Sequence, residues 1–493
     1  MPAIFAAALV FLSSAAVLVL EILAARLLAP YVGVTLEVYT AIIGTILAGI
    51  AFGSWWGGRY ADRKDPHTLI GPFLIAGGVL SFLTIPVVDA LGTGLRGASP
   101  LTTVVLTFMA FFAPAAVLTA VTPAVIKIQL ADLDETGRVV GRLSAIGTAG
   151  AIIGTFLTGF LLVAAAPTRP TIRVVAVFLI VLGIATIVYL RGTRQAVTMG
   201  TLVAIAVTGV LSFAARHPCD HESAYYCARV EVDAERPTGR ALWLDTLRHS
   251  YVDLEDPTYL EFTYTQWFGD VIDAVAPDGA PVQSVHVGGG GFTMPQYLRA
   301  LHPGSFSTVL EVDPFLVELS EDELGLELRD DIEAVTGDAR LTAESLDADR
   351  YDLVVNDAFG GVSVPWHLAT RDFLAQLDRA LVDDGVMITN VIDYGHRDFL
   401  RSYLATAGSV FDHVAIIGRP DAFGDGRGLG GNYVVIGSDA PLPVEEIEAA
   451  NRGRGHADEV LHGDALTTFV GDARVLTDDY APVDQLLTPT PDV

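Results

Sequence analysis

Four glycines and a set of carboxylates in the C-terminal half of the chain have the spacing of a nucleoside-binding site. The glycines, Gly288–Gly291, follow a predicted strand over 282–287 and precede a predicted helix over about 294–301. A glycine turn between a strand and a helix lets the backbone come close to a bound nucleotide. Four glycines are equally typical of a flexible turn. The residues that follow them are therefore needed to distinguish a nucleotide-binding turn from an ordinary one.

A carboxylate follows each of the next two predicted strands. Glu311 lies at the end of the strand over 307–312, with Asp313 close behind it. An acid about twenty residues after the glycines can accept hydrogen bonds from both hydroxyls of a ribose. Asp338, next to Ala339, follows a third strand-like stretch and could bind the amino group of an adenine. A single acid in so acidic a domain is usually solvated surface, and only the order of these acids favours binding.

Asp357 follows the predicted strand over 351–356 and is a candidate for a catalytic base. Ligands of open α/β sheets bind at the carboxyl ends of the strands, so we expect Asp357 to lie near the glycine turn. A helix cap or an ordinary turn residue is the alternative interpretation of this carboxylate.

The elements that would position these residues are short apolar strands that alternate with helix-length segments after Pro281. This alternation predicts βαβ units, a parallel sheet and therefore a Rossmann-like α/β fold. Before it, the chain alternates between apolar and polar positions in the manner of strands, as in Tyr225–Val232. We predict a small β-rich lid over 217–275 and a nucleotide-binding domain over 276–493.

The first 216 residues carry seven apolar stretches, most of which approach the roughly 20 residues that cross a bilayer. We place them at about 3–28, 38–58, 69–91, 101–129, 143–166, 172–190 and 197–215. They predict an α-helical, multi-span domain in the cell membrane, with the lipid bilayer as its partner. Charges deep inside the membrane, which would mark a transport path, are scarce, and Glu21 and Lys127 are the only candidates. This scarcity favours an anchor over a transporter.

Charge differs sharply between the two halves of the chain, whose net charge is −28. Residues 1–216 carry 13 Lys and Arg against 8 Asp and Glu, whereas residues 217–493 carry 17 against 50. An acidic, lysine-poor surface is typical of proteins in concentrated salt, and a GC-rich genome is the alternative cause. So acidic a domain excludes nucleic acid as a partner.

The loop charges and the cysteines indicate on which side of the membrane the C-terminal half lies, but they do not settle it. Cations are more frequent in the even loops (Arg59, Arg63, Lys64, Arg138, Arg142, Arg191 and Arg194) than in the odd ones (Arg96, Arg169 and Arg173). Even loops in the cytoplasm would place the C-terminal half outside. A disulfide between Cys219 and Cys227 would agree with a position outside the cytoplasm, where disulfides form. The alternative is that they are two ordinary buried residues. Without a Cys/His cluster, we expect no metal site.

Together these residues resemble spermidine synthase and related polyamine aminopropyltransferases, in a branch fused to a membrane domain. The resemblance covers about residues 220–490 and is carried by Val287–Gly291, Glu311–Pro314, Gly337–Ala339, Tyr351–Asp357, Leu368–Phe373 and Leu476–Asp484. It implies transfer of an aminopropyl group from decarboxylated S-adenosylmethionine to an amine or polyamine, without a metal. It also suggests a homodimer.

The resemblance implies a role for each candidate residue. Asp357 would be the catalytic base that takes a proton from the attacking amine. The donor would be held by Gly288, Gly289, Gly290, Gly291, Glu311, Asp313, Asp338 and Ala339. In the lid, the substrate-binding positions of the family would be filled by Tyr226, Tyr259 and Glu261.

Two departures from the family pattern leave other functions open. Gly291 stands where the family commonly has an acid that binds the free amine of the donor, and Gly360 replaces a second Asp. The loss at Gly291 removes a repulsion toward a donor carboxylate, which favours a methyltransferase that uses intact S-adenosylmethionine. A transporter or sensor that binds a nucleotide or polyamine without turnover is the third interpretation, although Asp357 argues against it.

Overall fold

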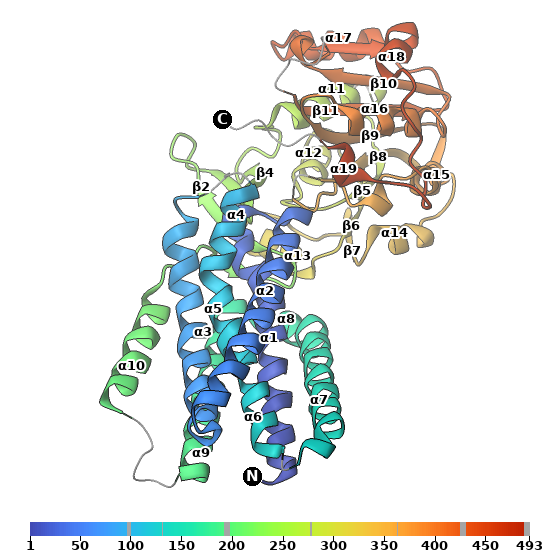
Figure 1. The fold of residues 1–493 in the computed structure, drawn as a ribbon. Helices are drawn as coiled ribbons and strands as arrows, with labels where there is room; N and C mark the ends of the chain where they lie inside the picture. Colours follow the sequence, from blue (N-terminus) through green and yellow to red (C-terminus); the bar gives the residue numbers. More distant parts are fainter. Residues whose placement is uncertain are drawn as a thin grey trace. The chain divides into compact units, whose positions relative to one another are not determined.

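The structure, a computed structural model, describes residues 1–95, 100–130, 132–191, 198–276, 279–361, 363–423 and 430–487 (Figure 1). Arg96 and Arg194, counted among the loop cations, lie outside these ranges. The chain forms two compact units, Met1–Cys227 and Ala228–Val493, so the division falls later than the predicted boundary at residue 216. We call them the helical unit and the sheet unit.

Within the described residues, six helices of the helical unit are long and apolar enough to cross a membrane. They are Ala3–Val32, Leu36–Arg63, Pro66–Gly92, Leu101–Gln129, Thr136–Ala165 and Thr168–Leu190. A shorter apolar helix, α10 (Met199–Ala214), follows them. Each of the seven predicted stretches therefore contains one apolar helix, and the last is too short at 16 residues to count with the other six.

Small residues let the helices of this unit approach one another closely. In α7 (Thr136–Leu157), a Cβ atom on Gly154 would stand 2.7 Å from the carbonyl oxygen of Ala15 in α1 (Ala3–Val32). A larger side chain at that place would therefore push α7 away from α1. This packing agrees with the small-residue spacing of transmembrane helices.

The predicted lid is a small antiparallel sheet followed by a helix. Its strands are β1 (His221–Glu222), β2 (Cys227–Val232), β3 (Gly239–Leu244) and β4 (Leu247–Asp253), in the order β1-β2-β3-β4. The helix α11 (Thr263–Val275) comes next and leads into the main sheet.

The main sheet has eight strands in the order β12-β10-β11-β9-β8-β5-β6-β7. Five of them run parallel, namely β5 (Gln283–Val287), β6 (Phe306–Glu311), β7 (Ile332–Thr336), β8 (Tyr351–Asn356) and β9 (Leu381–Asp393). The other three extend the sheet in antiparallel fashion: β10 (His413–Gly418), β11 (Gly431–Ser438) and β12 (Glu459–His462). The predicted parallel, Rossmann-like sheet is thus confirmed, while its antiparallel extension had no counterpart in the prediction.

Strand order fixes where a ligand can bind. The chain runs outward from β5 through β6 to β7 and then returns to β8 on the other side of β5. Connections therefore leave β5 and β8 in opposite directions, which opens a crevice at the carboxyl ends of these two strands. Gly288 directly follows β5, and Asp357 directly follows β8, so both lie at this crevice.

Helices cover both faces of this sheet, so its strands are buried on both sides (Figure 1). On one face, Val354 of β8 packs in a cluster with Phe373 and Phe399, from α15 (Arg371–Asp378) and α16 (Asp398–Ala407). On the other, the neighbouring Val355 belongs to a cluster with Trp267 of α11. The remaining helices of the unit are α12 (Thr293–Leu301), α13 (Pro314–Glu323), α14 (Ala339–Thr342), α17 (Val444–Gly453), α18 (Gly463–Val470) and α19 (Val483–Leu486).

Candidate active site

A cavity of about 530 Å³ lies at the switch point of the sheet. The glycine turn after β5 and Asp357 after β8 form one part of its wall. Side chains of β4 and α11 form another part, and Asn390 of β9 and Asn432 of β11 complete it. The structure thus brings together the glycines and the carboxylate that the sequence placed at strand ends more than sixty residues apart.

The glycine turn owes its path to the absence of side chains. Gly288 and Gly290 have φ angles of 91° and 50°, in the left-handed region that favours glycine. A Cβ atom on Gly288 would also stand only 2.8 Å from the carbonyl oxygen of Asp357. The turn can therefore pass close to the end of β8 only because residue 288 is a glycine.

Glu311, at the end of β6, holds this turn through the backbone. Its Oε2 accepts hydrogen bonds from the N–H groups of Gly289 at 2.7 Å and Gly290 at 3.3 Å, while Oε1 accepts one from Asp313 at 2.9 Å. The residue is only 4% exposed. Burial raises the pKa of Glu311 above its ordinary value, and these N–H groups oppose that rise. The carboxylate therefore ties the glycine turn to the neighbouring strand.

Of the predicted donor-binding residues, Gly288, Gly289 and Gly290 line the cavity in the described structure. The others do not: Gly291, Glu311, Asp313, Asp338 and Ala339. Asp313 is buried and caps α13 by accepting a hydrogen bond from the N–H of Phe315 at 3.1 Å. Asp338 caps α14 and lies 3.3 Å from Nε2 of His367, and Ala339 is buried beside it. Their role toward a nucleotide stays a prediction.

Asp357 is held at both carboxylate oxygens. Asn390 donates from Nδ2 to Oδ1 at 2.9 Å, and the hydroxyl of Tyr264 donates to Oδ2 at 3.1 Å. Asn432 in turn donates to Oδ1 of Asn390 at 3.0 Å, which fixes the orientation of that amide. Burial raises the pKa of Asp357 to about 7, and the two hydrogen bonds from Asn390 and Tyr264 act in the opposite direction. A carboxylate with this pKa can gain and lose a proton near neutral pH.

Tyr264 remains a proton donor under these conditions. Burial, followed by the nearby charge of Asp357, raises the pKa of its phenol well above the ordinary value. Its hydroxyl group therefore stays protonated at neutral pH and keeps donating to Asp357.

The three predicted substrate-binding residues of the lid lie elsewhere. Tyr259 donates from its hydroxyl to Oε2 of Glu261 at 2.7 Å, and neither residue is among those lining the described cavity. Glu261 reaches the cavity wall only through Arg248, whose two terminal nitrogens donate to Oε1 at 3.3 Å. Tyr226 belongs to the helical unit, where its N–H donates to the hydroxyl of Ser223 at 3.0 Å.

Sequence reasoning missed Tyr264, Asn390 and Asn432. Tyr264 lies only three residues beyond Glu261, so the prediction reached this stretch of the lid without naming the side chain that lines the cavity. Asn390 offered a usable signal, because an amide side chain stands in the mainly apolar stretch 386–391. Asn432 follows two glycines and carries no pattern of its own.

Comparisons with known proteins find relatives for about half of the chain. No protein-family model matches it. It is 29% identical over 222 residues to the polyamine aminopropyltransferase of Vibrio vulnificus (strain CMCP6), which covers 42% of this chain and 70% of that protein. Among solved structures, a probable spermidine synthase from Corynebacterium glutamicum ATCC 13032 matches with 26% identity and a TM-score of 0.49, covering 53% and 97% of the two chains. The spermidine synthase from Thermotoga maritima matches with 17% identity and a TM-score of 0.37, covering 51% and 82%.

The sequence relative confirms the resemblance predicted from the motifs. It accounts for less than half of the chain, so it says nothing of the membrane-fused branch. Over those 222 residues, this chain is a homologue of the polyamine aminopropyltransferases.

Proposed function

We propose that the chain is a membrane-anchored, spermidine synthase-like aminopropyltransferase. It would move an aminopropyl group from decarboxylated S-adenosylmethionine to an amine or polyamine acceptor. The observation that carries this proposal is the position of Asp357, whose carboxylate lies beside the glycine turn in a cavity at the switch point. The homology to a polyamine aminopropyltransferase supports it.

In the proposed reaction, Asp357 prepares the nucleophile. An ammonium group has no lone pair, so the acceptor has to lose a proton, which Asp357 takes. The amine nitrogen then attacks the carbon beside the sulfonium; the new C–N bond forms as the C–S bond breaks. The electron pair of the broken bond stays on sulfur, and methylthioadenosine leaves as a neutral molecule. Asn390 and Tyr264 keep the carboxylate aimed at the nitrogen.

The donor would lie over the glycine turn. Each oxygen of Glu311 already accepts from backbone N–H groups, but a carboxylate offers about four lone-pair sites, which leaves capacity for a ribose hydroxyl. Asp338 would bind the adenine end of the nucleoside. Asp313 caps α13, and the buried Ala339 is the first residue of α14, so both would support this edge of the sheet.

The helical unit would anchor the enzyme as a multi-pass protein of the cell membrane. Six helices that are long and apolar enough to span a bilayer support this placement. Homodimer formation stays a prediction from the resemblance.

A second candidate, a methyltransferase that uses intact S-adenosylmethionine, is favoured by the surroundings of Gly291, which adjoins the cavity-lining Gly290. A Cβ atom there would stand 3.0 Å from Cβ of Ser250 and 3.4 Å from Cδ1 of Leu324, so those residues fill the place of an acidic side chain. In the described lining, Asp357 is the only carboxylate, and Arg248 and Arg419 are also present. The α-carboxylate of an intact donor would therefore meet arginines rather than acids.

Product analysis separates these candidates. Purified protein in detergent and concentrated salt is given each donor with a panel of amines and polyamines. Methylthioadenosine with an alkylated amine is the expected result, whereas S-adenosylhomocysteine would establish methyl transfer instead. Saturable binding without either product would leave a nucleotide- or polyamine-binding sensor or transporter. Asp357→Asn, which keeps the glycine turn, serves as the control for a base-dependent reaction.

A further inference from the structure

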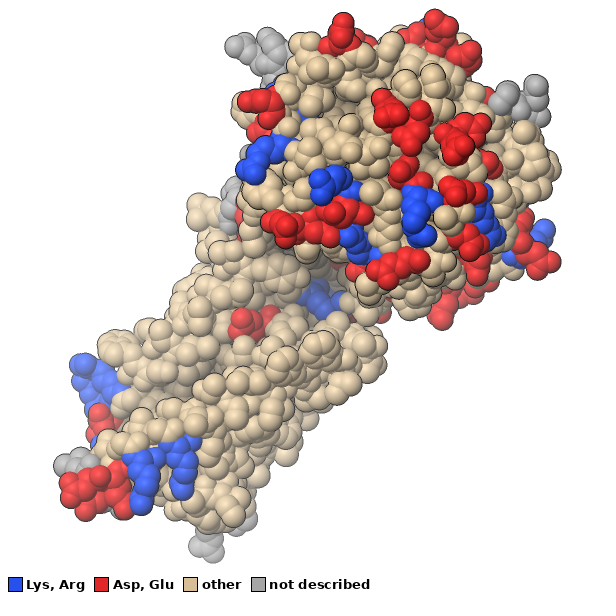
Figure 2. All heavy atoms as spheres, turned by 90° about the vertical axis from the view of Figure 1, so that its right-hand side faces the viewer, with Lys and Arg blue, Asp and Glu red and all other residues tan. Residues whose placement is uncertain are grey.

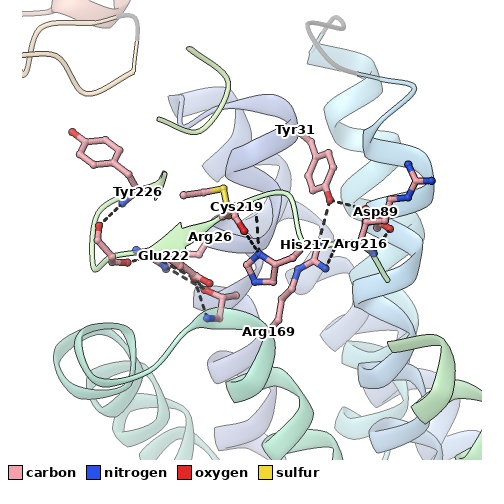
Figure 3. Close-up of a disulfide and its surroundings, with 12 residues drawn as sticks. Arg26, Tyr31, Asp89, Arg169, Arg216, His217, Cys219, Glu222 and Tyr226 are labelled. Carbon is pink, nitrogen blue, oxygen red and sulfur yellow. Dashed lines mark hydrogen bonds and ion pairs between the residues drawn. A yellow bond between two sulfur atoms is a disulfide. The ribbon is translucent and has the colours of Figure 1, made fainter. Parts of the chain in front are cut away.

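The helical unit has two chemically different ends. At one end, Tyr31 lies near the end of α1, Asp89 near the end of α3 (Ile70–Gly92), and Arg169 near the start of α9 (Thr168–Arg191). The Tyr31 hydroxyl donates to Asp89 at 3.1 Å and accepts from Arg169 at 3.2 Å, so these helix termini lie together. The N–H of Arg216, just after α10, also donates to Asp89 at 3.0 Å. We call this the disulfide end, because Cys219 and Cys227 are bonded next to it (Figure 3).

Side chains from the helix ends fasten the disulfide-bonded segment. Arg26 of α1 donates to the carbonyl oxygens of Ser223 and Ala224, and it also pairs with Glu222 at 3.4 Å (Figure 3). Glu222 accepts a further hydrogen bond from the N–H of Thr168 at 2.9 Å. The disulfide is therefore held against the helix termini rather than placed on a loose connection.

The opposite end of the unit is the basic end. Lys127 at the end of α6 (Val121–Gln129) pairs with Asp62 at the end of α2 (Leu36–Arg63) at 2.7 Å. Gln129 donates to the carbonyl oxygen of Met1 at 2.9 Å, which brings the start of α1 to the same end. Since α1 has 30 residues, the two ends are separated by roughly 45 Å, enough to cross a bilayer.

The two ends differ in how many of their Lys and Arg side chains are exposed to solvent. At the basic end, six described cations are exposed: Arg59, Arg63, Lys64, Lys127, Arg138 and Arg142. At the disulfide end, Arg169 is 2% exposed, Arg26 is engaged with Glu222, and Arg173 donates to the carbonyl oxygen of Ser212 at 2.7 Å. Among the described cations there, only Arg216 is exposed. Figure 2 shows blue side chains, with red ones beside them, at one end of a mostly uncharged helical surface.

We infer that the basic end faces the cytoplasm and that the disulfide end faces an oxidising compartment outside it. Exposed cations gather on the cytoplasmic side of membrane proteins, where anionic headgroups attract them. Disulfides persist in oxidising compartments and are rare in the cytosol. These two independent features agree on one orientation. The sheet unit continues from Cys227 at the disulfide end, so it works outside the cytoplasm.

This orientation has a consequence that rests on the proposed function. A nucleotide donor made in the cytoplasm would not reach the cavity directly. A transport step therefore has to deliver the donor, or the donor has to be present outside the cell. The acceptor amine would be an extracellular or surface-bound molecule.

The first test uses the native cysteines, which are the only two in the chain. Membranes from cells that express the full chain are denatured in the presence of a polymer-linked maleimide, with and without a reductant. We expect a mobility shift only after reduction, because both thiols are bonded. A shift without reduction would show free thiols and overturn the inference.

The second test determines directly on which side of the membrane the sheet unit lies. In a Cys219→Ser, Cys227→Ser background, Asp383→Cys places a thiol on the sheet unit, and Asp134→Cys is the matched reporter at the basic end; both positions are exposed. A membrane-impermeant maleimide should label the first in intact cells and the second only after permeabilisation. The reverse pattern would overturn the inference.

A protease applied to intact cells checks the wild-type chain without any substitution. It should remove the sheet unit and leave the helical unit. Neither labelling nor proteolysis requires donor binding or turnover. An inactive protein that is labelled from outside would therefore contradict only the proposed function.

Discussion

The two sides of the cavity are built in different ways. The proposed donor side consists mainly of backbone, a glycine turn in which Glu311 accepts from the N–H groups of Gly289 and Gly290. The acceptor side consists of side chains that meet from four elements, namely α11, the end of β8, β9 and β11, around Asp357. A backbone site depends on local geometry and tolerates changes around it, whereas a cluster of side chains is specific to its substrate. We therefore expect donor binding and turnover to respond to different substitutions.

The largest effect is expected from Asp357→Asn. Removal of the proposed base should lower kcat by about 10²- to 10⁴-fold, while donor affinity stays within a few-fold because the glycine turn is intact. Steady-state kinetics and calorimetry on the same preparation measure the two quantities. Asp383→Asn, an exposed acid of the same unit, is the matched control and should change neither. Turnover that survives in Asp357→Asn would remove this residue from the chemistry.

Glu311→Gln should produce the opposite pattern. An amide supplies one acceptor oxygen and an N–H₂ group, so at least one N–H of Gly289, Gly290 or Asp313 loses its partner. A buried unpaired N–H costs about 1–3 kcal/mol. If the free variant avoids this cost by shifting the turn, and the donor has to restore the turn, donor affinity falls by up to roughly 5- to 150-fold. Calorimetric titration of donor and of methylthioadenosine measures it. Unchanged affinity would mean that the donor does not use the glycine turn.

The spacing of glycines and acids along the chain was enough to predict that the glycine turn and Asp357 lie close together, because each directly follows a parallel strand. The acceptor side could not be predicted in this way. Tyr264, Asn390 and Asn432 are brought together by the sheet order, including an antiparallel strand between β9 and β10 that the alternation of elements did not indicate. The cysteine pair was ambiguous for another reason, since its bonding depends on the compartment.

Tyr264→Phe should shift a pH profile more than it lowers the maximal rate. The hydrogen bond from Tyr264 lowers the pKa of Asp357, so its loss moves that pKa above about 7. Because the base works only when ionised, the acidic limb of the profile of kcat against pH should move to higher pH. Activity at pH 7 should fall several-fold and recover at pH 9. A uniform loss at all pH values would indicate a role other than control of this proton.

The smallest effect concerns stability. The pKa of Asp357 in the folded protein, about 7, lies above its ordinary value of 3.8, so the folded state binds the proton more tightly than the unfolded state. This contribution to stability is present below about pH 4 and is lost as pH rises to 7. Asp357→Asn removes that loss, and its Tm should exceed that of the wild type at pH 8 but not at pH 4. Equal Tm values at both would show that the carboxylate is not desolvated.

Calorimetric titration of the folded wild-type protein with decarboxylated S-adenosylmethionine, the intact donor and methylthioadenosine would test the proposed nucleoside site most directly. We expect saturable heat with methylthioadenosine and with at least one of the two donors, and weaker binding in Glu311→Gln. Absence of heat with all three ligands, in protein whose sheet unit is shown to be folded, would mean that the cavity between β5 and β8 does not hold a sulfonium nucleoside.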